Sequence, residues 1–460
     1  MVNLSDITRS FKQFILKNLT YLLFISFFIL LWDSRFGVSF YGYFSVPVFL
    51  FIMLLVLFLV QFVKFNDYAI RSDHSIPIMF FSFLSIYCIG IFEKSFFLFD
   101  SMKSITDITV FYIVLIVTLI LGLVSIIIKS KLMCIAFFSF SILFNIVCII
   151  TCKDPGIDTY AFISMASDYL LSFKNPYVFT YPDYYKGLFA HLYGNTYYFN
   201  YWPFILYIVT PFKYFFGDVR YGLLFCNILF LLIIIWKRKL FNLSFYNASR
   251  LGSLWLLNPL LIYIILKCWV DAIVPLFILL IIVNLKERKL LFFSITVGLL
   301  ASIKLYFIFM IPFAVLYLWK ERISKKLFIK YIIIMGFSFL LPMIPFLICS
   351  PMEFFKSTIV FFMDSKVRYD SLSIIATLNN LKVDINIFSN KIILVFLTLM
   401  LFLYNKLNKS ISNFIKVLFI FYYFMFLFAK QSFAYYFLVN FTLIFLLLTI
   451  NDKLYESRKQ

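Results

Sequence analysis

Residues Ile108–Ile128 read ITVFYIVLIVTLILGLVSIII, a run without one charged side chain. A helix that crosses a lipid bilayer needs roughly 20 predominantly apolar residues, so this run is long enough for one crossing. Two other apolar runs, Leu229–Trp236 and Tyr331–Pro342, do not alternate between apolar and polar positions as the strands of a membrane barrel would. The pattern therefore predicts membrane helices.

The composition extends this prediction to the whole chain. Of its 460 residues, 64% are hydrophobic and 13% are charged, whereas soluble proteins are roughly half apolar and a quarter charged. We expect an all-α, polytopic transmembrane helical bundle with about 13 or 14 crossings. The expected crossings are residues 14–32, 44–63, 76–92, 108–128, 132–151, 221–236, 251–266, 269–284, 291–303, 305–319, 331–349, 391–404, 414–428 and 433–450.

The basic residues indicate which loops face the cytoplasm, where Lys and Arg are in excess. With both termini in the cytoplasm, the inner segments hold 25 of the 41 basic residues and 7 of the 21 acidic ones. The net charge of +20 belongs to loops rather than to a soluble basic domain, so we expect membrane lipids and no nucleic acid as partners. Heavy use of Phe, Ile, Lys, Asn and Tyr favours a bacterial plasma (inner) membrane.

One apolar segment, Trp202–Phe216, conflicts with this topology if it crosses the membrane, because the basic stretch at 237–250 would then face outward. We therefore predict that it returns to the outer face as a re-entrant or interfacial helix. Pro203 and Pro211 are compatible with such a short, broken element.

Three regions follow from this topology. Residues 1–151 form N-terminal transmembrane helices. Residues 152–220 form a long outer loop with interfacial helices. Residues 221–460 form a C-terminal transmembrane bundle with a second outer loop at about 350–390.

The outer side collects the ionisable residues that could carry chemistry. Several of them sit between apolar runs, where a charge is costly unless it faces water or a partner. A cavity that opens outward would give them a use. The set is Asp154, Asp158, Asp168, His191, Arg220, Lys267, Asp271, Lys304, Arg368 and Lys430.

The order of short motifs on this side resembles the GT-C class of membrane glycosyltransferases, in particular its polyprenyl-phosphate-sugar-dependent, mannosyltransferase-like members. The resemblance covers about 152–450. In that class the first-loop acidic residue follows the first crossing, whereas here five expected crossings precede the matching Asp158, and there is no Asp-x-Asp. The matching residues are Asp158, Asn175-Pro176-Tyr177, Tyr201-Trp202-Pro203, Phe216-Gly217, Arg220, Asp271, Lys304-Leu305-Tyr306, Arg368 with Ser371-Leu372-Ser373, and Gln431 with Tyr435-Tyr436.

The resemblance implies an inverting hexosyltransferase that works on the extracytoplasmic face. It would take a sugar from a polyprenyl-phosphate donor and pass it to a hydroxyl of a lipid-linked or glycan acceptor. Asp158, with Asp154 second, would be the general base. Fixed cations would stabilise the leaving phosphate: Arg220, Lys304, Arg368 and Lys430. Sugar or acceptor would contact Tyr177, His191, Tyr201, Trp202 and Asp271. No cofactor is expected, and no metal ligand set is indicated.

Each role has a structural alternative. Asp158 also suits the N-cap of a helix, and cations at helix ends can extend to lipid headgroups. Tyr and Trp populate membrane interfaces in general. A lone histidine such as His191 is more often structural, and Asp271 could pair with nearby Lys267.

Other functions also fit a helical bundle with outer loops. An O-antigen-type polysaccharide polymerase would depend on basic residues in two outer loops rather than on Asp158. A transporter or flippase for a lipid-linked saccharide would need charges deep within crossings, whereas most here fall at helix ends. A scaffold without catalysis would leave the outer carboxylates and cations without a use.

Overall fold

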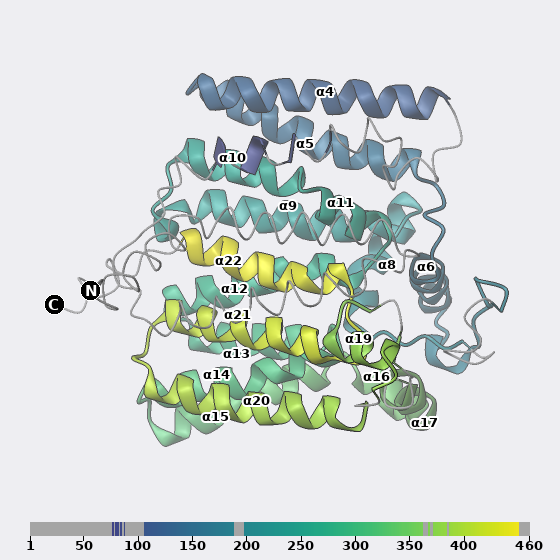
Figure 1. The fold of residues 1–460 in the computed structure, drawn as a ribbon, viewed down its shortest axis with the longest axis vertical. Helices are drawn as coiled ribbons and strands as arrows, with labels where there is room; N and C mark the ends of the chain where they lie inside the picture. The colour runs from purple at the N-terminus through teal and green to yellow at the C-terminus, as the bar shows by residue number, and fades with distance from the viewer. Residues whose placement is uncertain are drawn as a thin grey trace.

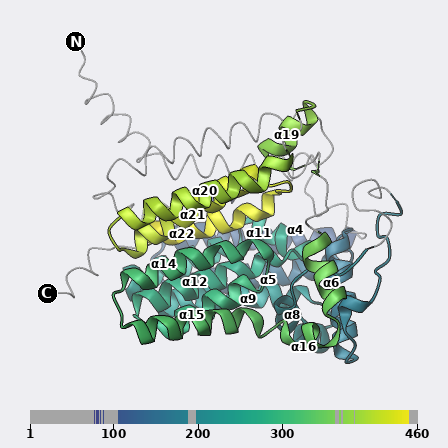
Figure 2. The ribbon, with the colours of Figure 1, turned by 90° about the horizontal axis from the view of Figure 1, so that it is seen from below.

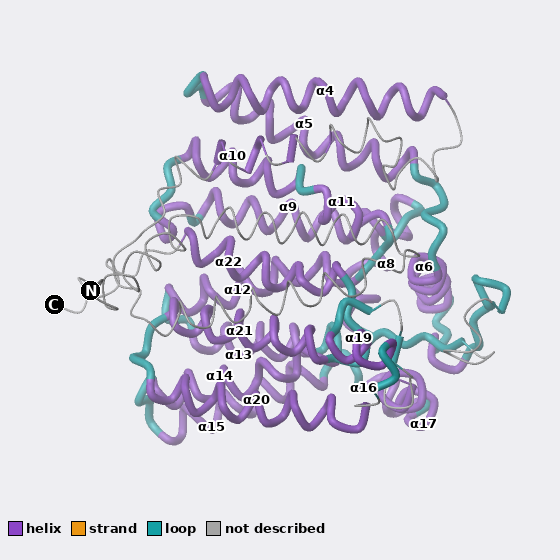
Figure 3. Tube along the Cα trace, viewed as in Figure 1, coloured by secondary structure: helices purple, strands orange, loops and turns teal. Residues whose placement is uncertain are grey.

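The computed structural model describes residues 105–187, 197–361, 367–368, 371–383 and 386–449, together with several positions between 76 and 87. Within these residues the regular elements are helical, and one isolated bridge joins Tyr181 to Tyr197. The predicted all-α class is thus confirmed (Figure 3). The crossings expected at 14–32 and 44–63, and part of the one at 76–92, lie outside the described residues.

Three described helices are long and apolar enough to cross a membrane: α4 (Ile105–Ile127), α5 (Lys131–Thr151) and α21 (Ile411–Phe428). Two bent pairs bring the number to five if each pair forms one span. These pairs are α8 (Phe204–Phe216) with α9 (Arg220–Trp236), and α10 (Phe245–Leu256) with α11 (Pro259–Leu266). Several other expected crossings are shorter or broken helices, so the expected number of crossings stays a prediction.

The shorter elements lie mostly in the second half of the chain. The crossing expected at 331–349 is two helices, because Pro342 cannot donate a helical hydrogen bond. The α-helices are α12 (Val274–Lys286), α13 (Leu290–Ala301), α14 (Met310–Lys320), α15 (Lys325–Leu340), α16 (Ile344–Cys349), α17 (Pro351–Phe355), α19 (Ile374–Asn380), α20 (Asn386–Lys406) and α22 (Leu438–Thr449). The single-turn elements are η2 (Pro176–Val178), η3 (Arg238–Phe241), η4 (Val270–Ile273), η5 (Leu305–Phe309), η6 (Lys356–Val360) and η7 (Ala434–Phe437).

Most of these helices run side by side, and the connecting loops gather at the two ends of the bundle (Figures 1 and 3). Helices α20, α21 and α22 form a layer over α12 and α14 (Figure 2). Helix α6 (Asp158–Leu171) lies across one end of the bundle, where α16 and α17 also lie (Figure 1). We call this end the α6 end.

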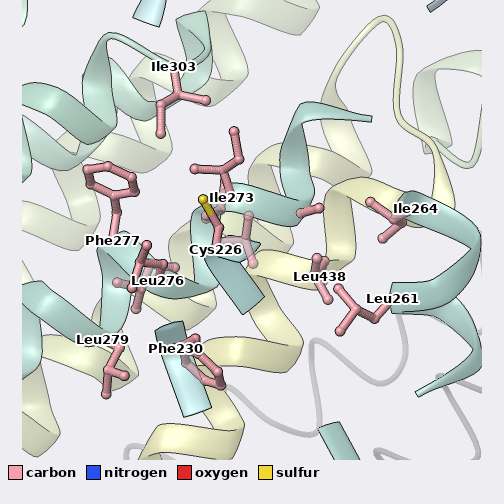
Figure 4. Close-up of a cluster of buried hydrophobic side chains, with 14 of the residues drawn as sticks. Cys226, Phe230, Leu261, Ile264, Ile273, Leu276, Phe277, Leu279, Ile303 and Leu438 are labelled. Carbon is pink, nitrogen blue, oxygen red and sulfur yellow. The ribbon is translucent and has the colours of Figure 1, made fainter. Parts of the chain in front are cut away.

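The centre of the bundle is an apolar core between α9, α11, α12 and α22. Cys226, Phe230, Leu261, Ile273 and Leu438 are buried there (Figure 4). Because an apolar core cannot satisfy polar groups by itself, its polar side chains bond to one another and to the backbone. An example is the indole of Trp255, which donates to Asn227 Oδ1 at 3.0 Å, while the Asn227 amide donates to the carbonyl of Ala272 at 2.8 Å.

Helices α13 and α15 approach each other closely at Gly298. A Cβ placed on this residue would lie 2.3 Å from the carbonyl oxygen of Met335. Small residues allow helix backbones in membrane proteins to pack at such short range. Gly298 therefore permits the contact between the two helices.

Helix α8 starts and finishes at the α6 end. Just before it, the hydroxyl of Tyr201 lies 3.0 Å from the Thr159 hydroxyl in the first turn of α6. Just after it, Arg220 donates to the carbonyl of Cys152 at the end of α5, at 2.6 Å. Gly217 ends the helix in the left-handed conformation, with a φ of 76°, and α9 then leaves at 113°. Both ends of α8 thus lie at the same end of the bundle, and the return of Trp202–Phe216 to the outer face of the membrane stays a prediction.

Candidate active site

Asp158 is the first residue of α6, and its carboxylate is held from two sides. The amide of Thr159 donates to its Oδ1 at 2.7 Å, and the hydroxyl of Tyr185 donates to the same oxygen at 3.3 Å. The N-cap position itself belongs to Ile157. The carboxylate is therefore held through Oδ1, and no residue that the structure describes hydrogen-bonds to Oδ2.

The surroundings of Asp158 make it a stronger base than an ordinary aspartate. Burial raises the pKa of the carboxyl, because a charged carboxylate is poorly solvated there. The hydrogen bonds from Thr159 and Tyr185 and the positive charge of Arg368 oppose this effect without reversing it. A carboxylate with a raised pKa binds a proton more readily at neutral pH.

Asp154 lies in the loop before α6 and is exposed. Its Oδ1 accepts from the amide of Gly156 at 3.0 Å and from the hydroxyl of Tyr184 at 3.1 Å. Gly156 has a φ of 64°, a conformation that favours glycine. Asp154 thus shapes the turn that leads into the helix, and it ranks behind Asp158 as a base.

Tyr201 connects Asp158 to a second charged cluster. Its hydroxyl bonds to Thr159 Oγ1, next to the Asp158 carboxylate. Burial is the main cause of its strongly raised pKa, and the negative charges of Asp158 and Asp271 add to it. Tyr177 donates to the Tyr201 carbonyl at 2.7 Å from a buried position. Tyr177 is therefore placed to support Tyr201 rather than to meet a substrate.

The second cluster is an ion pair under aromatic rings. Asp271, in η4, is 0% exposed, and its Oδ2 lies 2.9 Å from Lys304 Nζ. The hydroxyl of Tyr306 donates to the other carboxylate oxygen. The ammonium lies 4.1 Å from the ring centroid of Tyr436 and 5.0 Å from that of Tyr435. The Tyr306 hydroxyl and the two rings over Lys304 thus compensate the two charges for the hydration that they lose on burial.

The alternative pairing of Asp271 with Lys267 is wrong in this structure. Lys267 Nζ donates instead to the carbonyl of Pro155 at 2.5 Å. Between the two residues, Cys268 has a φ of 58°, which breaks the helical spacing that would bring them together. Lys267 thus holds the loop that leads into α6.

Arg368 stands between the two clusters. Its guanidinium lies 4.7 Å from the ring centroid of Phe433, which is nearly parallel to Tyr435 at 5.6 Å. Its positive charge acts on both Asp158 and Tyr185, where it opposes the rise in pKa that burial causes.

The loop that carries Arg368 is tied to the loop before η7, which also contains Lys430. The Ser432 amide donates to Ser371 Oγ at 2.6 Å, and the Leu372 amide donates to the Ser432 carbonyl at 2.7 Å. Lys430 lies two residues from this tie and is half-buried. The two loops therefore bring both cations to the α6 end.

Arg220 is occupied by partners other than the two clusters. It is 1% exposed, and its Nε and Nη2 donate to the carboxylate of Asp218. Its Nη1 donates to the carbonyl of Cys152, and its guanidinium lies 4.7 Å from the ring centroid of Tyr160. With these partners Arg220 joins α5, α6 and α9, and has little capacity left for a phosphate.

Two further residues were predicted to contact sugar or acceptor, and the structure describes one of them. Trp202 is 4% exposed and packs against Phe339, and its indole N–H has no hydrogen-bond partner within the described part of the chain. His191 lies outside the described residues.

Three site residues had no role in the sequence-based assignment: Thr159, Tyr185 and Phe433. Tyr185 belongs to a tyrosine-rich stretch, Tyr177–Trp202, in which no spacing distinguishes one ring from another. Tyr306, Tyr435 and Tyr436 belong to the motifs of the resemblance, and the structure assembles them around Lys304.

Comparison with known proteins adds nothing to this geometry, since no family model, curated protein or solved structure matches the chain. Among the residues that the structure describes, no group of three or more His, Cys, Asp or Glu side chains could hold a metal ion.

Proposed function

We propose that this chain is a GT-C-like membrane glycosyltransferase of the bacterial plasma membrane, with its active site on the extracytoplasmic face. It moves a sugar from a polyprenyl-phosphate donor to a hydroxyl of a lipid-linked or glycan acceptor. One observation carries the proposal. A carboxylate of raised pKa, Asp158, lies within electrostatic reach of Arg368, at the end of an apolar bundle.

Asp158 acts as the general base. The acceptor hydroxyl donates to the carboxylate, and its proton passes to Asp158 as its oxygen attacks the anomeric carbon. Thr159 and Tyr185 both hold Oδ1, so Oδ2 takes the proton. The new bond forms as the bond from the anomeric carbon to the phosphate oxygen breaks, which inverts the configuration.

The cations stabilise the leaving group. When the glycosidic bond breaks, its electron pair stays on the phosphate oxygen, and negative charge grows there. The charge of Arg368 acts on Asp158, and Lys304 is paired with Asp271, whose charge acts on Tyr201 beside Asp158. Lys304 is already paired with Asp271, so it contributes a fixed dipole and a position more than a free charge.

The aromatic residues between the two clusters suit a sugar. Trp269 and Tyr435 stack at 3.9 Å between ring centroids, beside Lys304. Tyr201 and Tyr185 carry hydroxyls at the Asp158 side. Rings with polar edges can stack on a sugar face and bond to its hydroxyls.

The experiment is a transfer assay with purified protein in lipid, a panel of labelled polyprenyl-phosphate sugars and a lipid extract as acceptor. Asp158→Asn should lower transfer by about 10²–10⁴-fold, since general base catalysis contributes that much. Glu353→Gln is the control, because Glu353 is an exposed carboxylate on α17, at the same end of the bundle as Asp158. It should transfer like wild type.

The other outcomes point to other functions. Equal transfer by wild type and Asp158→Asn would remove Asp158 as the base and leave Asp154 as the candidate. Without transfer from any donor, a polymerase or flippase becomes the better reading. Loss of polymer with Arg368→Gln but not with Asp158→Asn would favour the O-antigen-type polymerase.

A further inference from the structure

An apolar groove lies between the C-terminal end of α6 and α8. Its volume is about 370 Å³. The Thr210 hydroxyl, in its wall, has no hydrogen-bond partner in the described part of the chain. The groove is lined by Leu170, Leu171, Tyr207, Thr210, Pro211 and Tyr214.

The two helices that form the groove are held together beside it. Lys213 of α8 donates to Ser164 Oγ of α6 at 2.8 Å and lies 3.6 Å from Asp168. These contacts span the helix pair within one turn of Thr210 and Tyr214. The groove is therefore a built feature of the fold rather than a gap between loose elements.

Large apolar side chains are exposed at the end of α8, and the first of them, Tyr214, lines the groove. Tyr214, Phe215 and Phe216 are 68%, 74% and 65% exposed. Clusters of exposed aromatic residues at the end of an apolar bundle are typical of the boundary between lipid headgroups and hydrocarbon. A ligand that leaves the groove on this side would enter the bilayer.

Helix α6 connects the groove to the candidate active site. Asp158 begins the helix and Leu171 ends it. At 1.5 Å per residue, the two lie about 20 Å apart along the axis. A long-chain polyprenyl tail is longer than this distance, so one molecule can occupy both places.

We propose that the groove binds the isoprenoid chain of a polyprenyl phosphate whose phosphate lies beside Asp158 and Arg368. The identity of this ligand rests on the proposed function. A bilayer phospholipid fits less well, because its acyl chains run parallel to the spans. One wall of the groove, α8, is bent by 113° from the adjoining span helix α9.

The test uses the full chain in lipid nanodiscs and a polyprenyl phosphate without sugar, carrying a photoreactive diazirine within its chain. Peptide mass spectrometry should locate the label on the groove residues of α6 and α8. Tyr214→Glu should lower this label about tenfold, because a charge in an apolar wall opposes a hydrocarbon chain. Phe173→Glu, at a fully exposed residue just beyond the end of α6 that does not line the groove, should leave it unchanged. Both variants should elute and melt like wild type.

Three results would overturn the assignment: equal labelling in both variants, labelling at other helices only, or equal labelling by a diacyl phosphatidic acid probe. The assay also separates the two proposals. Groove labelling without sugar transfer in the companion assay would support the lipid site and remove the glycosyltransferase. Sugar transfer without groove labelling would support the glycosyltransferase and remove this lipid site.

Discussion

The Tyr185 hydroxyl donates to Asp158 Oδ1 at 3.3 Å and lies 3.4 Å from the Asp158 backbone nitrogen, which donates to it. One hydroxyl thereby holds both the carboxylate and the backbone at the start of α6. The two residues are 27 positions apart in the sequence, so the loop after α6 folds back to fix the candidate base.

The raised pKa of Asp158 predicts the pH dependence of transfer. The base must be ionised, so the rate should rise with pH through a midpoint above the ordinary value of an aspartate. Replacing Tyr185 with Phe removes a hydrogen bond that lowers this pKa, so the midpoint should move to higher pH. The measurement is the acidic limb of kcat/KM against pH. An unmoved limb in Tyr185→Phe would assign the titration to another group.

The same raised pKa predicts the stability of Asp158→Asn. The folded state holds the proton more tightly than the unfolded state, so the contribution of Asp158 to stability falls as pH rises through the folded pKa. At pH 7 the ionised carboxylate thus lowers the stability, and Asn should melt no lower than wild type. Thermal melts in detergent at pH 7 check this. A clearly lower Tm would show that the carboxylate is needed to build the site.

Arg368→Gln should lower kcat by about 10²-fold or more, because it removes a charge that faces the growing negative charge on phosphate. Lys174→Gln is the control, since Lys174 is an exposed cation just beyond the other end of α6. Steady-state transfer kinetics of both variants give the comparison. Equal kinetics for the two variants would remove Arg368 from phosphate stabilisation.

The Asp271–Lys304 pair predicts a double-mutant pattern. Asp271→Asn or Lys304→Met alone should lower the free energy of unfolding by about 3–5 kcal/mol, because either leaves a buried charge unpaired. The double variant should recover much of this loss. Sugar transfer should stay impaired in the double variant if Lys304 also stabilises the leaving phosphate. Full recovery of both properties would make the pair structural only.

Arg220→Met should act on folding rather than on chemistry. It leaves Asp218, which is 15% exposed, without its partner and frees two carbonyls at the end of α5. We expect a lower Tm and a lower yield of folded protein, with kcat per folded molecule near that of wild type. Active-site titration against a polyprenyl-phosphate donor separates yield from rate. A normal Tm with a strongly lowered kcat would show that Arg220 stabilises the leaving phosphate after all.

The helical class could be predicted from the sequence because a bilayer requires long apolar runs, as at Ile108–Ile128. The gathering of Asp158, Asp271, Lys304 and Arg368 at one end could be predicted because charges are excluded from the apolar interior. Both predictions depend on composition along the chain, which the sequence displays directly.

The pairing of these charges could not be predicted, because it depends on contacts between distant segments. Asp271 is four residues from Lys267 yet pairs with Lys304, since the backbone at Cys268 breaks the helix between them. In the sequence, nothing distinguishes Arg220 from another cation at the start of a helix. Its contacts with Asp218 and with the end of α5 appear only in the fold. Local spacing alone carries neither fact.

The return of α8 determines from which end of the bundle each helix of the C-terminal half starts. Because α8 ends where it began, α9 starts at the α6 end, which is the outer face in the proposed topology, and each later crossing takes its direction from that start. An insertion that lengthened α8 into a full span would invert every helix after it. In the proposed topology, Lys237 and Glu287, which pair at 2.5 Å at the far end of the bundle, would then move from the cytoplasmic side to the outer side. One short helix thus sets the direction in which the helices of more than half of the protein run.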